Sequence, residues 1–188
     1  MHNPQANRLF FRAQQWLIAL LMGGCLLLSA CDTDSSFFPD RVMGYAPVYV
    51  PLAELEDIRG LPPQPLRNPG RILIWQNYLL VNELYEGVHI IDNENPANPV
   101  QIGFIKILGN VEIGLKDNVL FADNYTDLIT IDLTNFGNLT VSSRLEDVFE
   151  PALFPPVTDT YFQCADTFQG IVVGWEFTEL TNPQCYRP

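Results

Sequence analysis

The sequence predicts an all-β fold, a partial β-propeller made of two four-stranded blades of about 40 residues each, with extra strands at each end. Three observations lead to this prediction. An internal repeat relates residues 76–99 to residues 116–139 with a constant offset of 40 positions. Each copy contains short runs rich in Val, Ile, Leu and Tyr that are bounded by Asn, Asp, Gly and Pro, as strands and turns are. The runs are nearly continuously apolar, which is typical of sheets covered on both faces.

The composition allows one folded domain and excludes one class of partner. The chain has 188 residues, of which 47% are apolar and 17% are charged, so a packed core is feasible. Acidic residues outnumber basic ones by 22 to 10 and give a formal net charge of −12. Because this charge repels phosphate backbones and no basic stripe offsets it, we expect no nucleic-acid partner.

The amino terminus predicts export. Arg8 and Arg12, without any acid, precede an apolar run over residues 16–28, and small residues follow. A basic start, a short apolar stretch and small residues before a cleavage site make a secretory signal. The run is also shorter than the roughly 20 apolar residues of a membrane-spanning helix.

The end of this run resembles the bacterial lipobox. Residues 28–31 are Leu-Ser-Ala-Cys, and in that family of signals the Cys is acylated and then becomes the first residue of the mature chain. The resemblance implies that residues 1–30 are a lipoprotein signal peptide and that Cys31 is lipidated. It also implies a lipid-anchored protein at the bacterial outer membrane or cell surface. An ordinary secretory signal and an uncleaved anchor are the alternatives.

Cleavage would leave a more acidic chain that starts with a polar tether. Residues 1–30 contain two arginines and no acid, so the remainder has 8 basic and 22 acidic side chains, and its formal charge is 8 − 22 = −14. Residues 31–42 are expected to be an acidic tether. Acids directly after a lipidated Cys resemble the surface-export signals of Bacteroidetes lipoproteins, and also the inner-membrane retention signals of enteric bacteria.

Two cysteines remain beyond the lipobox region, Cys164 and Cys185. A cysteine pair in an exported chain indicates a disulfide, and closing a loop of this length contributes roughly 3 kcal/mol. A metal or redox pair is the alternative, but the spacing is not that of a C-x-x-C motif and no histidine stands nearby.

Residues 67–149 are expected to form the two blades. The expected strands of the first copy are residues 71–75, 78–82, 87–91 and 100–107, and those of the second copy are residues 111–115, 119–122, 128–131 and 139–145. Residues 43–66 form a proline-rich entry segment in which Pro51 begins a short helix through Ile58, since proline is favoured at the first helical position. Residues 150–188 supply the C-terminal strands and the disulfide.

One stretch carries a family resemblance. Residues 87–99, Gly-Val-His-Ile-Ile-Asp-Asn-Glu-Asn-Pro-Ala-Asn-Pro, resemble the LVIVD repeat of bacterial surface β-propellers, in which a Gly-aliphatic strand ends in Asp before an Asn-Pro-x-x-Pro turn. The wider stretch 41–175 resembles the amino-terminal part of LVIVD-repeat lipoproteins of the Bacteroidetes type. The second copy has Phe136 and Leu139 where the prolines would fall. The resemblance implies a propeller-like fold at the cell surface, but no reaction, ligand or catalytic residue.

Two blades cannot close a ring, because propellers usually have 4–8. Even with the further strands expected within residues 43–52 and 158–177, the chain holds roughly three blades' worth. We therefore expect an open stack, half of a homo-oligomeric ring or a truncated family member. Open blades leave strand edges that proteins normally cover, so truncation or a partner is favoured over an isolated monomer.

The sequence offers little catalytic machinery. Beyond the expected signal peptide there is one histidine, His89, inside an expected strand and without a nucleophile motif beside it. No glycine-rich phosphate loop occurs, and the His and Cys content is too low for a zinc site, so we expect no catalytic residue, no metal and no cofactor. The alternative is a carbohydrate-active or other hydrolase that uses acidic loop residues such as Glu83 and Asp123.

Two tyrosines are the candidate ligand contacts. Tyr85 and Tyr125 recur at the same position of the repeat, near the turn between the second and third strands. On an exposed groove they could stack on a glycan or on a protein partner, and a structural role is the alternative.

These expectations combine into one functional hypothesis: a lipid-anchored envelope protein that acts as a binding or scaffold module for an unknown ligand, and not an enzyme. The expected partners are the membrane, a protein partner or a second copy, and a glycan. The two alternatives are the hydrolase described above and a structural envelope protein completed by oligomerisation.

Overall fold

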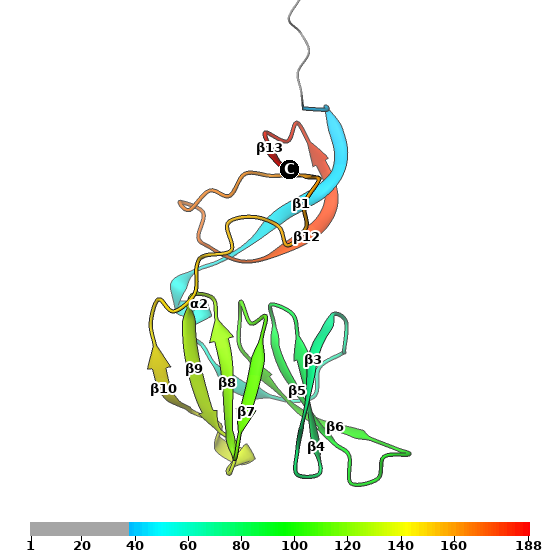
Figure 1. Ribbon diagram of the computed structural model, residues 1–188, viewed down its shortest axis with the longest axis vertical. Helices are drawn as coiled ribbons and strands as arrows, with labels where there is room; N and C mark the ends of the chain where they lie inside the picture. The colour runs from blue at the N-terminus through cyan, green and yellow to red at the C-terminus, as the bar shows by residue number, and fades with distance from the viewer. Residues whose placement is uncertain (1–37) are drawn as a thin grey trace, which may run out of the picture. The chain divides into compact units, whose positions relative to one another are not determined.

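Three β-sheets account for most of the regular structure of residues 38–188, the part of the chain that the computed structural model describes (Figure 1). Sheet 1 has the strand order β2-β6-β5-β4-β3, sheet 2 the order β10-β9-β8-β7, and the terminal sheet the order β12-β1-β11-β13. The strands are β1 (Arg41–Val50), β2 (Arg59–Leu61), β3 (Pro69–Trp75), β4 (Tyr78–Glu83), β5 (Gly87–Asp92), β6 (Val100–Lys106), β7 (Ile113–Lys116), β8 (Val119–Asn124), β9 (Asp127–Asp132), β10 (Val141–Leu145), β11 (Thr160–Phe162), β12 (Ile171–Thr181) and β13 (Cys185–Arg187). The all-β prediction is confirmed, and in these residues the sheets do not close into a ring.

Helical structure in the described part of the chain is short. It consists of α2 (Leu52–Leu55) and a 3-10 turn, η1 (Phe136–Asn138). The predicted helix through Ile58 is therefore too long, and Pro51 caps α2 instead of starting it, since its carbonyl accepts the N–H groups of the first turn. Among residues 38–188 no helix is long and apolar enough to cross a membrane. The predicted signal peptide and the lipidated Cys31 lie outside the described residues.

Sheets 1 and 2 are two copies of one antiparallel meander, β3 to β6 and β7 to β10, and sheet 1 adds β2 beside β6. The likeness extends to an irregularity. In each copy the last strand has one unpaired extra residue, Ile102 in β6 and Ser142 in β10, opposite the same position of its neighbour. These two residues are 40 positions apart, so the repeat fixes the bulge as well as the strands.

The first hairpin of each copy departs from the predicted constant offset. β4 and β8 begin at Tyr78 and Val119, which are 41 positions apart. The difference arises in the next turn, which has three residues in sheet 1 (84–86) and two in sheet 2 (125–126). Since successive side chains alternate between the faces of a strand, this single residue changes which face an aligned side chain occupies.

One apolar core joins sheets 1 and 2. It includes Val88 of β5 and both Ile129 and Ile131 of β9, all fully or almost fully buried. At the offset of 40 that holds for these strands, Ile129 and Ile131 correspond to His89 and Ile91, which lie on the face of β5 opposite to Val88. The two copies therefore present opposite faces of the same repeat to their common core. Each buried aliphatic side chain contributes about 1.5–3 kcal/mol to this packing.

The terminal sheet joins the first and last described strands. β1 pairs with β12 over ten residues, from Arg41 with Thr181 to Val50 with Ile171, and also pairs with β11. The predicted extra strands at each end are thus confirmed, and they share one sheet. Its small core is aromatic, with the ring of Phe162 edge-on to that of Trp175 at 5.6 Å.

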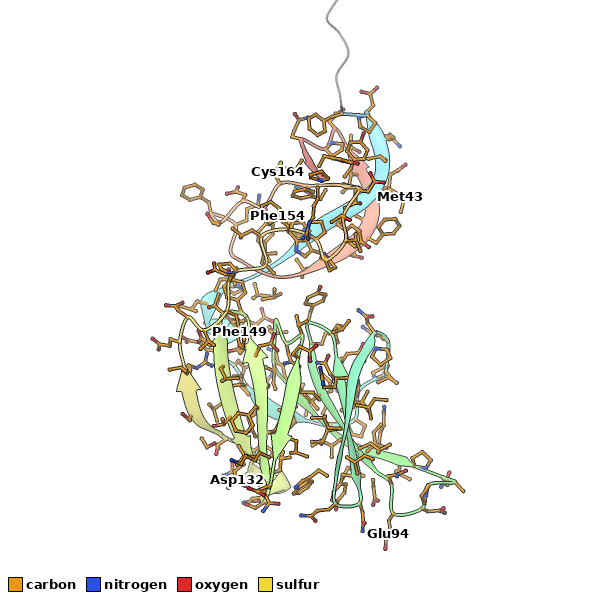
Figure 2. The ribbon with its side chains drawn as sticks, viewed as in Figure 1. Met43, Glu94, Asp132, Phe149, Phe154 and Cys164 are labelled. Carbon is orange, nitrogen blue, oxygen red and sulfur yellow. A yellow bond between two sulfur atoms is a disulfide. The ribbon has the colours of Figure 1, made fainter. Side chains whose placement is uncertain are left out.

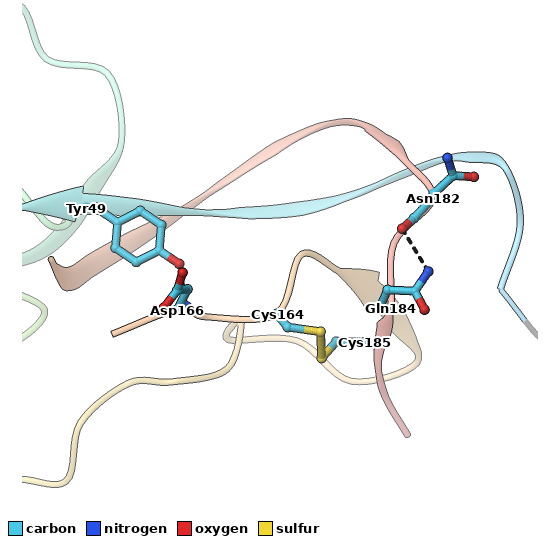
Figure 3. The surroundings of a disulfide bond; sticks show 6 residues. All are labelled: Tyr49, Cys164, Asp166, Asn182, Gln184 and Cys185. Carbon is cyan, nitrogen blue, oxygen red and sulfur yellow. Dashed lines mark hydrogen bonds between the residues drawn. A yellow bond between two sulfur atoms is a disulfide. The ribbon is translucent and has the colours of Figure 1, made fainter. Parts of the chain in front are cut away.

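The predicted disulfide between Cys164 and Cys185 is confirmed, with an S–S distance of 2.06 Å (Figure 3). It lies beside the paired strands β11 and β13. The loop that follows Cys164 is also held to β1, because the N–H of Asp166 donates to the hydroxyl of Tyr49 at 2.7 Å. Figure 3 shows this contact beside the disulfide, so the loop is fixed at two places.

Candidate functional site

A partly open cavity of about 420 Å³ lies between the turns of sheets 1 and 2, the outer face of sheet 2 and strand β12. Both predicted ligand contacts, Tyr85 and Tyr125, line it. Phe149 lines it as well, and Figure 2 shows this residue at the end of sheet 2 that lies opposite Asp132. The volume is within the range of small-molecule sites.

The two tyrosines occupy left-handed turn positions. Their φ angles are 70° at Tyr85 and 62° at Tyr125, a conformation that costs about 1 kcal/mol or more for a residue other than glycine. Hydrogen bonds offset this cost at Tyr85, whose N–H donates to the carbonyl of Asn110 at 2.6 Å and whose carbonyl accepts the N–H of Gly109 at 2.9 Å. Gly109 lies against Tyr125, since a Cβ there would come within 3.1 Å of the Tyr125 backbone nitrogen. One connecting segment therefore positions both aromatic side chains.

Gly174 makes room for one of these rings. It lies in the middle of β12, and a Cβ at this position would come within 2.8 Å of Cγ of Tyr85. The tyrosine ring thus packs directly on the strand backbone. Any larger residue at position 174 would push Tyr85 away and change the cavity.

Apolar side chains form most of the walls. Phe121 and Leu128 come from the outer face of sheet 2, and Val172 and Val173 come from β12. Phe149 closes one side, where its N–H and that of its neighbour donate to the carbonyl of Thr126 in the β8–β9 turn. The crossover after sheet 2 is therefore tied to the same turn that carries Tyr125.

Among the acidic side chains that line the cavity, Asp123 accepts the most hydrogen bonds. Its Oδ1 accepts the N–H groups of Val111 and Glu112 at 2.9 and 2.8 Å and the side-chain amide of Asn110 at 2.7 Å. Its Oδ2 accepts only the N–H of Val111, at 3.1 Å. Burial raises the pKa of Asp123 above its ordinary value, although these hydrogen bonds act in the opposite direction. One oxygen of this carboxylate is saturated and the other keeps acceptor capacity.

All other charged side chains in the lining are also acidic. Glu112 forms an ion pair with Nε of Arg71 at 2.7 Å, and Glu150 is exposed on the crossover after sheet 2. No Lys, Arg or His side chain of the described residues lines the cavity. The site is therefore apolar with a negative rim.

The hydroxyl groups of both tyrosines stay protonated well above neutral pH. Burial raises the pKa of Tyr85, with a smaller contribution from Tyr45, and burial also raises the pKa of Tyr125. Each side chain thus offers an aromatic face together with a hydroxyl that donates and accepts.

Glu83, the other acid of the hydrolase hypothesis, does not line the cavity. It is 1% exposed and receives a hydrogen bond from Nε2 of His89 at 2.8 Å, and His89 is itself 0% exposed. The backbone N–H groups of Arg67 and Asn68 also donate to its carboxylate. Burial opposes the ionisation of Glu83, but these hydrogen bonds outweigh it and lower the pKa of the carboxyl group. The arrangement holds residues 67–68, which lead into β3, against Glu83 of β4.

A buried amide pair links strand β4 to the segment that connects β6 with β7. Asn82 donates to Oδ1 of Asn110, and Asn110 donates in turn to Asp123 and to the carbonyl of Glu112. Both asparagines are fully buried. The sequence analysis missed them because a single Asn in a strand or turn carries no sign of burial.

The sequence analysis also missed the wall that β12 supplies. Val172 and Val173 belong to a run that is apolar throughout, so its strand character is evident, whereas its contact with a turn almost 90 residues earlier is not. In residues 38–188 no group of three or more His, Cys, Asp or Glu side chains is placed to hold a metal ion.

No family model, no curated protein and no solved structure matches the chain.

Proposed function

We propose that this protein is an envelope-anchored binding module whose ligand site is the cavity around Tyr85 and Tyr125. The observation that carries the proposal is that the repeat's two equivalent tyrosines line one cavity of about 420 Å³ together with apolar walls. Concave, mainly apolar sites with a few polar groups are the usual form of small-ligand sites. The module is attached to the membrane through the lipidated Cys31, as the lipobox resemblance implies.

We further propose that sheets 1 and 2 are consecutive blades of a propeller-type stack. In such a stack every blade lays one face on the opposite face of the next, and the shared core of the two sheets has this arrangement. The repeated bulge at Ile102 and Ser142 supports the same assignment, as does the resemblance of residues 87–99 to LVIVD repeats.

The hydrolase alternative receives less support from the geometry. A glycosidase needs two carboxyl groups that both reach the substrate. Glu83 is almost fully buried, and its carboxylate already accepts hydrogen bonds from His89 and from the backbone N–H groups of Arg67 and Asn68. We therefore favour binding without turnover.

A cavity-filling variant tests the proposal. Gly114 lines the cavity, and a Cβ there meets nothing closer than 3.7 Å, so Gly114→Leu fills the space without a backbone clash. Gly60→Leu is the matched control, because Gly60 is another strand glycine whose Cβ would first meet an atom at 3.7 Å and it lies outside the cavity.

The measurement uses residues 31–188 with Cys31→Ser, a chain that contains the whole compact unit of residues 38–188. The probe is the neutral fluorophore N-phenyl-1-naphthylamine, whose emission rises in apolar sites. We expect saturable binding to the parent chain and to Gly60→Leu, and at least tenfold weaker binding to Gly114→Leu. Equal binding by all three chains, or no saturable binding to the parent, would contradict the proposal.

A further inference from the structure

The charge around the cavity favours a ligand with a positive charge. Three acidic side chains line it, Glu112, Asp123 and Glu150, and among the described residues no basic side chain does. Arg71 neutralises only Glu112. The net negative charge of the whole chain acts in the same direction, since it attracts cations over longer distances.

The aromatic side chains of the lining also favour a cation over an anion. Tyr85, Tyr125, Phe121 and Phe149 all contribute to the cavity, and the faces of their rings carry partial negative charge. A cation over such a face gains about 0.5–2 kcal/mol, depending on how far it is desolvated. An anion would meet repulsion from both the rings and the carboxylates.

Asp123 supplies a specific place for the charge. Its Oδ1 already accepts three hydrogen bonds, while Oδ2 accepts a single one at 3.1 Å. A carboxylate oxygen that keeps a lone pair inside a half-buried cavity is a strong acceptor for an N–H donor with positive charge. The donor can approach Oδ2 without displacing the hydrogen bonds that hold Val111 and Glu112.

We propose that the cavity binds an apolar, aromatic amine, with the hydrocarbon part against Val172, Val173 and the aromatic rings and the ammonium group at Oδ2 of Asp123. Glu150, at the exposed rim, attracts the cation from solvent. This inference rests on the proposed function, because it specifies the ligand of the same cavity.

Three naphthalene probes that differ in the substituent at position 1 test the inference. They are 1-naphthylmethylammonium, 1-naphthalenemethanol and 1-naphthoate, which share the naphthalene ring and differ in charge from positive to neutral to negative. Binding to residues 31–188 with Cys31→Ser is measured by calorimetry at neutral pH and low salt. We expect the ammonium probe to bind about tenfold more tightly than the alcohol, and the carboxylate to bind most weakly.

Two substitutions test which acidic side chains cause the preference for the ammonium probe. Glu150→Gln removes a charge on an exposed side chain. We expect it to weaken binding of the ammonium probe about threefold and to leave binding of the alcohol unchanged. Asp123→Asn is expected to abolish the preference for the ammonium probe. Glu146→Gln is the control, because Glu146 is also exposed after β10 but lies outside the cavity.

The outcomes separate the two proposals. If the alcohol binds and the ammonium probe gains nothing over it, the amine inference is wrong while the binding function stands. If the preference exists but survives both Glu150→Gln and Asp123→Asn, the assigned groups are wrong. If none of the three probes binds, the cavity is not a ligand site and both proposals fail.

Discussion

The outer faces of sheets 1 and 2 are opposite faces of the same repeat, and they differ in how far they are covered. In sheet 1, Glu83 and His89 lie on this face and are almost completely buried, and the N–H groups of residues 67–68 are hydrogen-bonded to Glu83. In sheet 2, Phe121 and Leu128 lie on this face and border a cavity. The comparison teaches that one repeat can form the same sheet twice, while the face that each copy turns outwards and the segments that cover it decide which copy keeps an accessible site. The predictions below test this contrast in order of expected effect.

Removing the buried acid of sheet 1 should have the largest effect. Glu83→Ala leaves the buried Nε2 of His89 and two partly buried backbone N–H groups without their acceptor, so we expect the free energy of unfolding to fall by about 3–5 kcal/mol. Urea unfolding followed by tryptophan fluorescence measures it. Glu94→Ala, in an exposed turn of the same sheet, is the control and should be indistinguishable from the parent. A loss below about 1 kcal/mol would mean that other contacts hold residues 67–68 and His89 in place.

Opening the disulfide should have the next largest effect, and a local one. Replacing Cys164 and Cys185 together by serine should cost about 3 kcal/mol, since the 21-residue separation is no longer closed in the unfolded chain. Amide hydrogen exchange should speed up in β11 and β13 before it does so in sheets 1 and 2. Uniform acceleration over all three sheets would show that the terminal sheet and the repeat sheets unfold as one unit.

Truncating the acid of sheet 2 should cost less than truncating that of sheet 1. Asp123→Ala removes the acceptor of three N–H donors, but the carboxylate is only half-buried and two of the donors belong to the exposed residues Val111 and Glu112, so we expect about 1–2 kcal/mol. Urea unfolding under the same conditions gives the direct comparison. If Asp123→Ala costs as much as Glu83→Ala, the difference in sealing between the two sheets does not govern stability.

The two carboxyl groups should also respond to pH with opposite sign, which is the smallest expected effect. The pKa of Glu83 is lowered, so its contribution is present above its ordinary value of 4.5 and is lost as the pH falls through the lowered pKa. The pKa of Asp123 is raised, so its charged form opposes folding, and protonation relieves this as the pH falls through the raised pKa towards its ordinary value of 3.8.

Stability curves between pH 3 and 7 for the parent, Glu83→Gln and Asp123→Asn measure the two contributions. Glu83→Gln should flatten the loss of stability on the acid side, and Asp123→Asn should steepen it. Shifts of the same sign in the two variants would contradict the opposite pKa directions.

Local features of the fold followed from the sequence, whereas contacts between distant segments did not. The strands of the repeat and the disulfide were predicted because apolar periodicity, turn residues and cysteine count are local or compositional properties. The prediction of Tyr85 and Tyr125 as ligand contacts came from their repeat position, and the structure brings them to one cavity. Whether they bind a ligand stays a prediction.

The role of Glu83 shows what local patterns miss. Its pairing with His89 depends on the register of β4 with β5, and its remaining hydrogen-bond donors are the backbone N–H groups of Arg67 and Asn68, just before β3. Sequence alignment placed Glu83 and Asp123 at one repeat position, but a turn longer by one residue gives them different surroundings. The clearance between Gly174 and Tyr85 depends in the same way on the packing of β12.

The pairing of β1 with β12 also implies an order in which the sheets can form during synthesis or export. Arg41 lies opposite Thr181, a partner 140 positions later, while every hairpin of sheets 1 and 2 closes between neighbouring strands. A chain synthesised or translocated from its amino end can complete both repeat sheets early, but β1 has no antiparallel partner until the last strands have emerged. During this interval its open edges are exposed to other chains, so rapid completion of the carboxyl end protects the newly made protein from aggregation.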